Sequence, residues 1–307
     1  DSVKIEYYLD AVQIIKILKY ALKQETLMSY QTLDLTVTDA VAHLQLNRPD
    51  AYNSMNRTFW QEFPEAVRAV DNAAQARVLV ISSGGKHFSA GMDLEIFTQP
   101  DPQMFNGEAG RRAEAMRRLV QQLQACFSVL EEIRIPVVTA IQGGCIGGAL
   151  DLVCASDMRY CTSDAFFTVK ETELGMTADL GTLQRLPGLI APGLARELAY
   201  TGRKMLAQEA LTSGFVNQIY ADQQQMLDGV MQIAAQIAGR SPLAVTGCKQ
   251  MINYARDHNT ADSLSYMATW QAAMFQPADM MQTFTAKMSG KKPEFEALRP
   301  IKPAFTD

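Results

Sequence analysis

Histidine is scarce in this chain of 307 residues, which contains only His43, His87 and His258. They are scattered along the sequence without the spacing of metal ligands, so the pattern argues against a zinc enzyme and against a Ser-His-Asp triad. No Gly-x-Ser-x-Gly motif occurs either, which disfavours a serine hydrolase. We therefore expect no metal site and no chemistry based on histidine.

Cysteine is also infrequent, and its pattern does not indicate a disulfide framework. The five cysteines are odd in number, lie in apolar stretches and show no Cys-x-x-Cys spacing. We expect reduced thiols buried in the core of a protein from a cytosol-like compartment. Because no base is assigned beside them, packing is favoured over a nucleophilic role. The residues are Cys126, Cys145, Cys154, Cys161 and Cys248.

Long apolar runs and strong positive charge are both missing. Polar residues interrupt every apolar stretch well short of the ~18 residues that a membrane helix requires, so no membrane span is expected. The net charge is −5, and no run of Lys or Arg reverses it, which argues against a nucleic-acid partner. With 48% hydrophobic residues, the chain can bury one large core, alone or with a smaller appended unit.

The first 27 residues differ from the rest of the chain. Residues 1–27 mix apolar and charged side chains in a loosely helical pattern, without a signal-peptide cleavage site or the composition of a transit peptide. We expect a cloning or start-site extension without function, and a cytoplasmic location of the bacterial type. Strand and helix patterns alternate over residues 28–222, the predicted core. Residues 223–307 form a predicted C-terminal helical region for oligomerisation.

Several local patterns predict elements of the core. Alternation with period two on both sides of Thr38 predicts a hairpin over residues 33–46. A helix is expected to begin at Asn56 or Ser54 and to run through Val67. Further strands are expected over 77–82, 137–141, 157–161 and 165–169, and a long helix over 111–132.

Two glycine-containing turns follow buried strands and carry the strongest chemical signal. After the strand over 137–141, four glycines between residues 143 and 148 allow backbone N–H groups to approach a ligand without an intervening Cβ. A helix is expected to leave this turn at Ala149, with its first amides and its dipole facing the ligand. The other turn spans residues 84–91. One N–H group from each turn would provide the two donors that an enolate or tetrahedral oxyanion requires.

Several motifs resemble those of the enoyl-CoA hydratase/isomerase (crotonase) superfamily, and the resemblance covers residues 28–295. They are Asn47-Arg-Pro-x-x-x-Asn53, Phe88-Ser-Ala-Gly-Met-Asp-Leu, the turn from Gly143 to Asp151, and Gly181-Thr-Leu-Gln-Arg-Leu-Pro. The run Lys170-Glu-x-x-x-Gly-x-x-Ala-Asp-x-Gly is similar to the dienoyl-CoA isomerases in particular. The resemblance implies an α/β fold, a crotonase-like superhelix of repeated strand-strand-helix units with a C-terminal helical region.

The resemblance also implies roles for individual residues. The N–H groups of Met92 and Gly148 would hold a thioester oxygen. Glu171 and Asp179 would form a proton-transfer pair, with Asp151 as a third acidic group. Hydratases carry a small residue where Asp179 stands, so the extra carboxylate favours an isomerase. Further substrate and CoA contacts are implied for Ala90, Gly91, Asp93, Leu94, Glu95 and Gly147.

The implied activity is conversion of a 3,5-dienoyl-CoA into a 2,4-dienoyl-CoA in β-oxidation of unsaturated fatty acids. One carboxylate would remove the proton beside the thioester carbonyl, and another would deliver a proton four carbons away. Analogy with hydratases places Glu171 at the α-carbon and Asp179 at the distal carbon. Enoyl-CoA hydration stays open as an alternative, as does a CoA- or RNA-binding scaffold, which the intact acidic set and the lack of a lysine-rich helix disfavour.

Each acidic residue, taken singly, also has an ordinary structural interpretation. Asp151 could be an ion-paired residue of a helix, and Glu171 could form a surface pair with Lys170. Asp179 could cap the helix that is expected from Thr182 onward. Only their joint pattern favours a site.

An acyl-CoA thioester is the expected partner, as substrate, and no cofactor is implied. The phosphates of CoA require local cations, but Asp50 stands where family members often have a lysine. In this superfamily the helical tail packs on a neighbouring subunit, so the resemblance implies a homotrimer or a dimer of trimers. Candidate cations are Arg57, Lys86, Lys287, Lys291 and Lys292.

Overall fold

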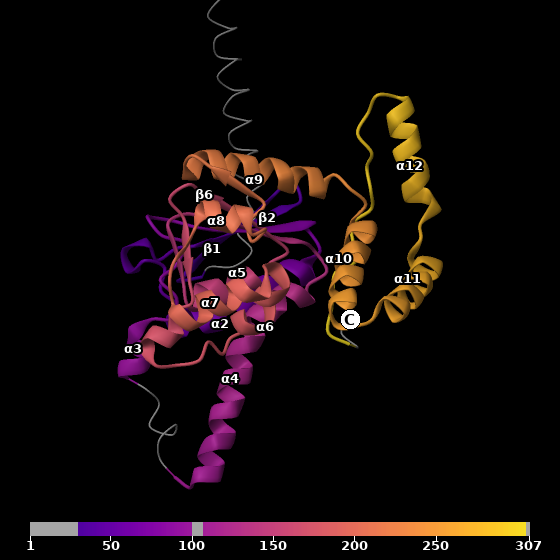
Figure 1. The fold of residues 1–307 in the computed structure, drawn as a ribbon. Coiled ribbons are helices and arrows are strands. Elements are labelled where there is room, and N and C mark those ends of the chain that lie inside the picture. The colour runs from indigo at the N-terminus through magenta and orange to yellow at the C-terminus, as the bar shows by residue number, and fades with distance from the viewer. Residues whose placement is uncertain (1–29, 100–106, 305–307) are drawn as a thin grey trace, which may run out of the picture.

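The computed structural model describes residues 30–99 and 107–304, which form two β-sheets surrounded by helices (Figure 1). The larger sheet has the strand order β1-β2-β3-β4-β6-β9, and only β1 pairs antiparallel to its neighbour. The smaller sheet has the order β5-β7-β8. The strands are β1 (Leu33–Thr38), β2 (Val41–Leu46), β3 (Val78–Ser83), β4 (Val137–Ile141), β5 (Gly144–Ile146), β6 (Met158–Thr162), β7 (Phe166–Thr168), β8 (Met205–Leu206) and β9 (Gln218–Tyr220).

Helices connect the parallel strands and cover the larger sheet on both sides, which is the α/β arrangement expected from the sequence. Helix α9 lies across β2, β3, β4, β6 and β9, while α2 packs against β1 and α4 on the other side (Figure 1). The helices are η1 (Pro49–Ala51), α2 (Arg57–Ala73), α3 (Leu94–Thr98), α4 (Ala109–Glu132), α5 (Gly148–Cys154), η3 (Glu171–Leu174), α6 (Thr182–Leu189), α7 (Pro192–Thr201), α8 (Ala207–Thr212), α9 (Gln223–Ala238), α10 (Pro242–Asp257), α11 (Thr260–Met274) and α12 (Pro277–Met288).

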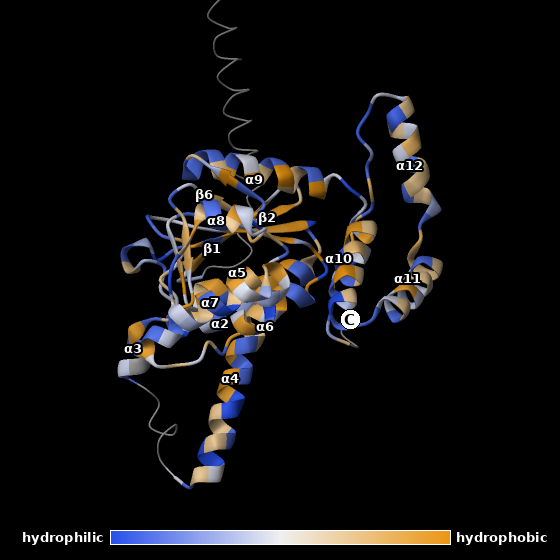
Figure 2. Cartoon of the chain, in the orientation of Figure 1, coloured by the Kyte–Doolittle hydropathy of each residue, from blue (hydrophilic) through white to orange (hydrophobic). Residues whose placement is uncertain are grey.

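The central strands are buried on both faces, which explains their continuous apolar sequences. In β3, Val78 and Val80 belong to the cluster beneath α9, whereas Leu79 and Ile81 belong to the main core on the opposite face. This division follows from the two-residue side-chain period of a strand. The strands are accordingly among the most hydrophobic parts of the chain (Figure 2). The sheet thus provides a rigid base for the turns that follow β3 and β4.

The local predictions for the core are confirmed. Strands β1 and β2 form the expected hairpin, and its turn residues Asp39 and Ala40 have φ values of 49° and 63°. Asn56, rather than Ser54, is the N-cap of α2, because its side chain accepts a hydrogen bond from Phe59 N–H. The expected strands correspond to β3, β4, β6 and β7, and the expected long helix is α4.

Helix α9 still packs on the large sheet, and the chain leaves the core only after this helix ends at Ala238. Helix α10 returns to the core through Lys249, whose buried ammonium group donates to the carbonyls of Leu130 and Ile135. Helices α11 and α12 stand away from the core (Figure 1), and α11 buries no residue. The last described residues run back along the core, where Ile301 N–H donates to the Asn72 carbonyl.

The cysteines agree only in part with the expectation that all of them are buried. Four cysteines are buried as expected, but Cys248 is exposed on α10, because its helix presents that position to solvent. The predicted extension over residues 1–27 lies outside the described residues. Within the described residues, no helix combines the length and apolarity needed to cross a membrane.

Candidate active site

The first glycine-containing turn is fastened to the rest of the core by Asn53. This residue has a φ of 51°, and its side-chain amide donates to the carbonyls of Gly84 and His87 at 2.8 and 3.1 Å. Its own carbonyl accepts a hydrogen bond from Ser89 Oγ at 2.8 Å. Asn53 therefore connects both ends of the turn to the segment before α2. The Asn47-to-Asn53 motif is thus a structural support of the site.

Two backbone N–H groups meet where the two turns approach each other. Met55 forms a bridge with the first turn through Gly91 O and Asp93 N, which leaves Met92 N–H without an acceptor among the described residues. Gly148 N–H is also without one there, because Gly148 is the first residue of α5. A Cβ atom added to Gly148 would lie 3.7 Å from Met92 N, so the two donors border the same small space. The geometry suits an oxyanion hole.

Gly91 must be glycine for this approach to occur. Its φ is +82°, and a Cβ there would lie 2.4 Å from the Ile146 carbonyl oxygen and 3.2 Å from Gly148 N. Either feature would strain any other residue. The close contact of the two turns is therefore built into the sequence.

Glu171 lies beside the second turn, at the start of η3. Its Oε1 would be 3.2 Å from a Cβ on Gly147, a residue with a φ of +54°. Gly147 N–H donates to Thr168 O at 3.0 Å, which ties the turn to the strand that precedes Glu171. Lys170 pairs with Glu173 rather than with Glu171. The simple surface pair that the sequence left open for Glu171 is thus not formed.

Asp151 is fully buried on α5. Its Oδ1 accepts a hydrogen bond from Thr182 N–H at 2.6 Å, and its Oδ2 has no partner among the described residues. The pKa of Asp151 is raised from 3.8 to about 6, chiefly by burial and also by the charge of Asp179, against the opposing effects of the Thr182 hydrogen bond and the charge of Arg185. A buried carboxyl oxygen without a partner is unusual in a purely structural residue.

Asp179 is the most exposed of the three acidic residues, and it lies between the buried side chains of Ala178 and Leu180. Its backbone carbonyl accepts a hydrogen bond from Gln124 Nε2 of α4 at 2.7 Å. Partial burial raises the pKa of its carboxyl above 3.8. Asp179 does not cap α6, because the N-cap is Gly181 and the first amide of that helix is bound by Asp151.

The fold brings the three carboxylates close enough for their charges to interact. Burial, together with the charges of Asp151 and Asp179, raises the pKa of Glu171 from 4.5 to about 7. Such values allow both protonated and ionised forms near neutral pH, as proton transfer requires. A cluster with these properties is a candidate active site rather than a set of ion pairs.

The other residues predicted to contact the substrate or CoA range from buried to exposed. The carboxylate of Asp93 caps α3, and it also accepts a hydrogen bond from Ser54 Oγ at 2.8 Å and pairs with Arg48 at 3.3 Å. The hydrogen bond from Ser54 is the main cause of the lowered pKa of Asp93. Its side chain thus supports the turn, as Asn53 does. The side chains of Leu94 and Glu95 are exposed, Ala90 is partly buried, and Gly91 and Gly147 are buried.

Two other expectations concern ligands that bind through charge. The described residues contain no group of three or more His, Cys, Asp or Glu side chains placed to hold a metal ion. The candidate cations for the CoA phosphates differ in their surroundings. Lys86, Lys287, Lys291 and Lys292 are exposed, and the Arg57 guanidinium donates to the carbonyl of Gln99.

Comparison with known proteins places this geometry in context. The sequence profile of the enoyl-CoA hydratase/isomerase family matches residues 36–298. The mitochondrial Delta(3,5)-Delta(2,4)-dienoyl-CoA isomerase of Homo sapiens is 43% identical over 266 residues, covering 86% of this chain and 81% of that protein. The peroxisomal enzyme of the same name from Arabidopsis thaliana is 40% identical over 277 residues, 89% of this chain and all of that protein. A crystal structure of enoyl-CoA hydratase from Bacillus anthracis superposes with a TM-score of 0.78 at 27% identity, covering 86% and 99% of the two chains. The fold is therefore crotonase-like, as the motifs implied.

The comparison corrects the expected location. The sequence analysis expected a cytoplasmic, bacterial-type protein, and this is wrong, because the similar proteins are named as mitochondrial and peroxisomal. The expectation rested on the absence of a recognised targeting signal. Such signals are short segments that receptors read, so the folded core that carries the resemblance holds no record of the compartment.

Proposed function

Because the chain belongs to the enoyl-CoA hydratase/isomerase family, we propose that it is an isomerase that converts 3,5-dienoyl-CoA into 2,4-dienoyl-CoA in fatty-acid β-oxidation. The Delta(3,5)-Delta(2,4)-dienoyl-CoA isomerases of Homo sapiens and Arabidopsis thaliana are 43% and 40% identical to it over most of the chain. The observation that carries the proposal is the cluster of Asp151, Glu171 and Asp179, whose pKa values are all raised by burial, beside two backbone amides that have no acceptor among the described residues. The charges of Asp151 and Asp179 add to the raised pKa of Glu171. The acyl-CoA thioester is the substrate, and the reaction needs no cofactor.

Glu171 is the base at the α-carbon in this proposal. Its pKa of about 7 makes it a stronger base than an ordinary carboxylate, and a fraction of it is ionised at neutral pH. Removal of the α-proton moves the electron pair into the conjugated system and places negative charge on the thioester oxygen. The N–H groups of Met92 and Gly148 would stabilise that oxygen, each by about 3–4 kcal/mol in a well-formed oxyanion hole.

Asp179 completes the reaction by delivering a proton at the distal carbon, four carbons from the first. One carboxylate cannot easily serve both ends of the conjugated system, so a second acid is needed. Partial burial raises the pKa of Asp179, so its carboxyl holds a proton more readily than that of an ordinary aspartate. Asp151 is the third acid, and its charge contributes to the raised pKa of Glu171. The segment from Ala90 to Glu95 and Gly147 would line the path of the thioester and CoA.

Self-association is a further part of the proposal. Helices α11 and α12 expose large apolar side chains although they are well-formed helices away from the core (Figure 2). Exposed apolar surface of this extent is typical of an interaction surface. We infer a homotrimer or a dimer of trimers, which light scattering of the purified protein would measure. The exposed residues are Leu264, Met267, Met274, Met280, Met281, Phe284 and Met288.

Absorbance separates the proposed isomerase from a hydratase, the alternative that the Bacillus anthracis structure favours. A 2,4-dienoyl thioester absorbs at longer wavelength than its 3,5 isomer, whereas hydration of crotonyl-CoA removes conjugation. The purified protein is therefore assayed on 3,5-octadienoyl-CoA and on crotonyl-CoA side by side. Turnover of crotonyl-CoA alone would refute the isomerase.

Isotope exchange tests the division of roles. In deuterated water, Asp179→Asn should still exchange the α-proton of the substrate, because forming the dienolate needs only Glu171 and the two amides. Glu171→Gln should lose this exchange, and both variants should lose isomerase turnover by ~10²–10⁴-fold. Mass spectrometry of recovered substrate gives the result. The opposite pattern of exchange would reverse the two roles, and loss in both variants would mean that the carboxylates act as one coupled unit.

A further inference from the structure

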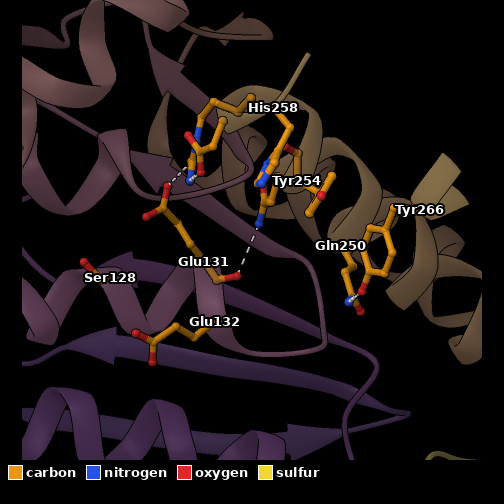
Figure 3. Close-up of a pocket in the computed structure, with 10 residues that line it drawn as sticks. Ser128, Glu131, Glu132, Gln250, Tyr254, His258 and Tyr266 are labelled. Atoms are coloured by element: carbon orange, nitrogen blue, oxygen red, sulfur yellow. Dashed lines mark hydrogen bonds and ion pairs between the residues drawn. The ribbon is translucent and has the colours of Figure 1, made fainter. Parts of the chain in front are cut away.

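A chain of charged groups runs from the candidate active site to the C-terminal region, and Glu131 is its centre. At the end of α4, Glu131 Oε2 accepts a hydrogen bond from Arg185 Nη2 at 2.7 Å, and its Oε1 binds the guanidinium of Arg256 on α10. Ser128 Oγ also accepts from Arg185, at 3.0 Å. Figure 3 shows Glu131 at the junction between the core and the C-terminal helices, whereas the side chain of Glu132 points away from those helices. Ser128, Glu131 and Arg256 line an open pocket of about 420 Å³ between α4 and the C-terminal helices.

Arg185 reaches from this cluster back over the turn that precedes its own helix. Its Nη1 occupies the space beside Gly181, where an added Cβ would lie only 1.9 Å away. Gly181 has a φ of +130° and is the N-cap of α6. The next residue, Thr182, donates its backbone N–H to Asp151 Oδ1. Asp179 lies two residues before Gly181. The guanidinium therefore covers the turn that orients two of the three carboxylates.

We propose that Arg185, clamped by Glu131, is a positioning residue that holds the Gly181 turn so that Asp151 and Asp179 keep their reactive geometry. This inference rests on the proposed function, since it assigns a task within the same acidic site. Arg185 touches none of the reacting groups itself. Its guanidinium acts through the backbone of residues 179–182, and its charge acts on Asp151 through space.

The burial of the clamp makes it more effective than a surface ion pair. The side chains of Arg185 and Glu131 are 13% and 18% exposed, whereas exposed ion pairs such as Arg68 with Glu132 are 51% and 56% exposed. Burial opposes ionisation of Glu131, but the hydrogen bonds and charges of both arginines outweigh it, so its pKa is lowered. An ionised, little-solvated carboxylate with two guanidinium partners fixes their positions closely.

The clamp also gives the C-terminal region a contact that leads to the site. Arg256 is 49% exposed, and Asn253 Nδ2 of the same helix donates to the Glu131 carbonyl at 3.2 Å. Helix α10 thus binds Glu131 through both its side chain and its backbone. Since Arg256 is more exposed than Arg185, removing it should disturb the site less.

The test compares Arg185→Met, Arg185→Lys and Glu131→Gln with Glu132→Gln as the matched control, because Glu132 is the adjacent residue on α4 and pairs only at the surface with Arg68. The assay follows 3,5-octadienoyl-CoA turnover from pH 5 to pH 9. We expect kcat to fall by ~10–100-fold in Arg185→Met and Glu131→Gln, the scale of a small misplacement of catalytic groups, with KM within about twofold of wild type. Glu132→Gln should behave as wild type.

The pH titration of Asp151 separates positioning from simple loss of structure. Loss of the Arg185 charge removes an influence that opposes the raised pKa of Asp151, whose other charged neighbours are Asp179 and Glu171. The carboxyl of Asp151 should therefore titrate at higher pH in Arg185→Met than in wild type, which carbon NMR of the carboxyl group measures. In Arg185→Lys, which keeps the charge without the planar fork, this titration should stay in place while kcat remains reduced. Unchanged kcat in both Arg185 variants, or an equal loss in Glu132→Gln, would overturn the inference.

Hydrogen–deuterium exchange gives a result that does not depend on the reaction. The amides of residues 179–186 should exchange faster in Glu131→Gln than in Glu132→Gln, because the turn is no longer held. If wild-type protein fails to isomerise the substrate, the proposed function is refuted, and this measurement still decides the clamp. Equal exchange in the two variants would refute the clamp whatever the activity.

Discussion

Asp151→Asn is expected to change the pH dependence of stability while it lowers activity. The carboxyl is fully buried, accepts one hydrogen bond from Thr182 N–H, and has no partner for Oδ2 among the described residues. Burial is the first cause of its raised pKa, which rises from 3.8 to about 6. A rise of about two pH units corresponds to ~3 kcal/mol between the folded and unfolded chains.

The sign of this effect follows from where the group ionises. Below pH 3.8 both the folded and the unfolded chain hold the proton, so Asp151 contributes no penalty; above about pH 6 both lose it, and the fold carries the full ~3 kcal/mol. Asparagine has no charge, but its Nδ2 would be a buried donor without an acceptor, at a cost of about 1–3 kcal/mol at every pH. The variant should therefore gain stability relative to wild type as pH rises, by about 1.4 kcal/mol from pH 5 to pH 8.

Urea unfolding at pH 5 and pH 8, at one protein concentration, measures this change. Asp228→Asn on the exposed face of α9 is the matched control and should show no such trend. Isomerase turnover of Asp151→Asn should fall by ~10²-fold or more if its carboxyl takes part in proton transfer. A stability difference between variant and wild type that stays constant with pH would refute the reasoning about the buried charge.

Three further predictions follow from other parts of the structure. Gly91→Ala should lower kcat by ~10²–10³-fold, because a Cβ 2.4 Å from Ile146 O displaces the Met92 amide. The control is Gly107→Ala, since Gly107 also has a positive φ, of +100°, but an added Cβ there would have nothing within 4 Å. An equal loss of kcat in the two variants would contradict this prediction. Lys249→Met should lower the free energy of unfolding by about 3–5 kcal/mol in urea, since it leaves Asp157 and two buried carbonyls without their cation. A urea midpoint equal to that of wild type would count against this prediction. With a pKa of about 7 for the base Glu171, kcat/KM should rise with pH up to about 7 and level off above it, and a profile flat from pH 5 to pH 8 would exclude this base.

The sequence predicts best those parts of the fold that depend on local pattern. The apolar run over 137–141 and the glycines after it predict β4 and the second turn, because strand burial and turn geometry are written in adjacent residues. The N-cap at Asn56 is found for the same reason. The position of α9 is not predictable in this way, since its sequence resembles that of the other C-terminal helices, yet it packs on the sheet. Packing partners are chosen by the three-dimensional fold.

In the candidate site too, contacts between residues far apart in the sequence were not predictable from local pattern. Asp179 was open to interpretation as the cap of α6, but the carboxylate that binds the first amide of α6 is Asp151, which lies 31 residues from Thr182. Capping rules describe neighbours within a few residues and so do not detect it. The contacts of the Asp93 carboxylate with Ser54 and Arg48 join distant segments and were not visible in the sequence, and its expected place along the substrate path stays a prediction. The proposed catalytic roles of Glu171 and Asp179 come from resemblance and remain predictions.

The structure suggests why an acidic cluster of this kind needs a clamp. Asp151 and Glu171 both have raised pKa values because they are buried near like charges, so each ionisation makes the folded site less stable. Such a turn would relax if its carboxylates could turn toward solvent. The arginine on Gly181 opposes this movement, and its partner Glu131 is kept ionised by that arginine together with Arg256 of α10. Stability that the site itself lacks is therefore supplied from the junction with the C-terminal region, which ties the geometry of the acids to the helix that leaves the core.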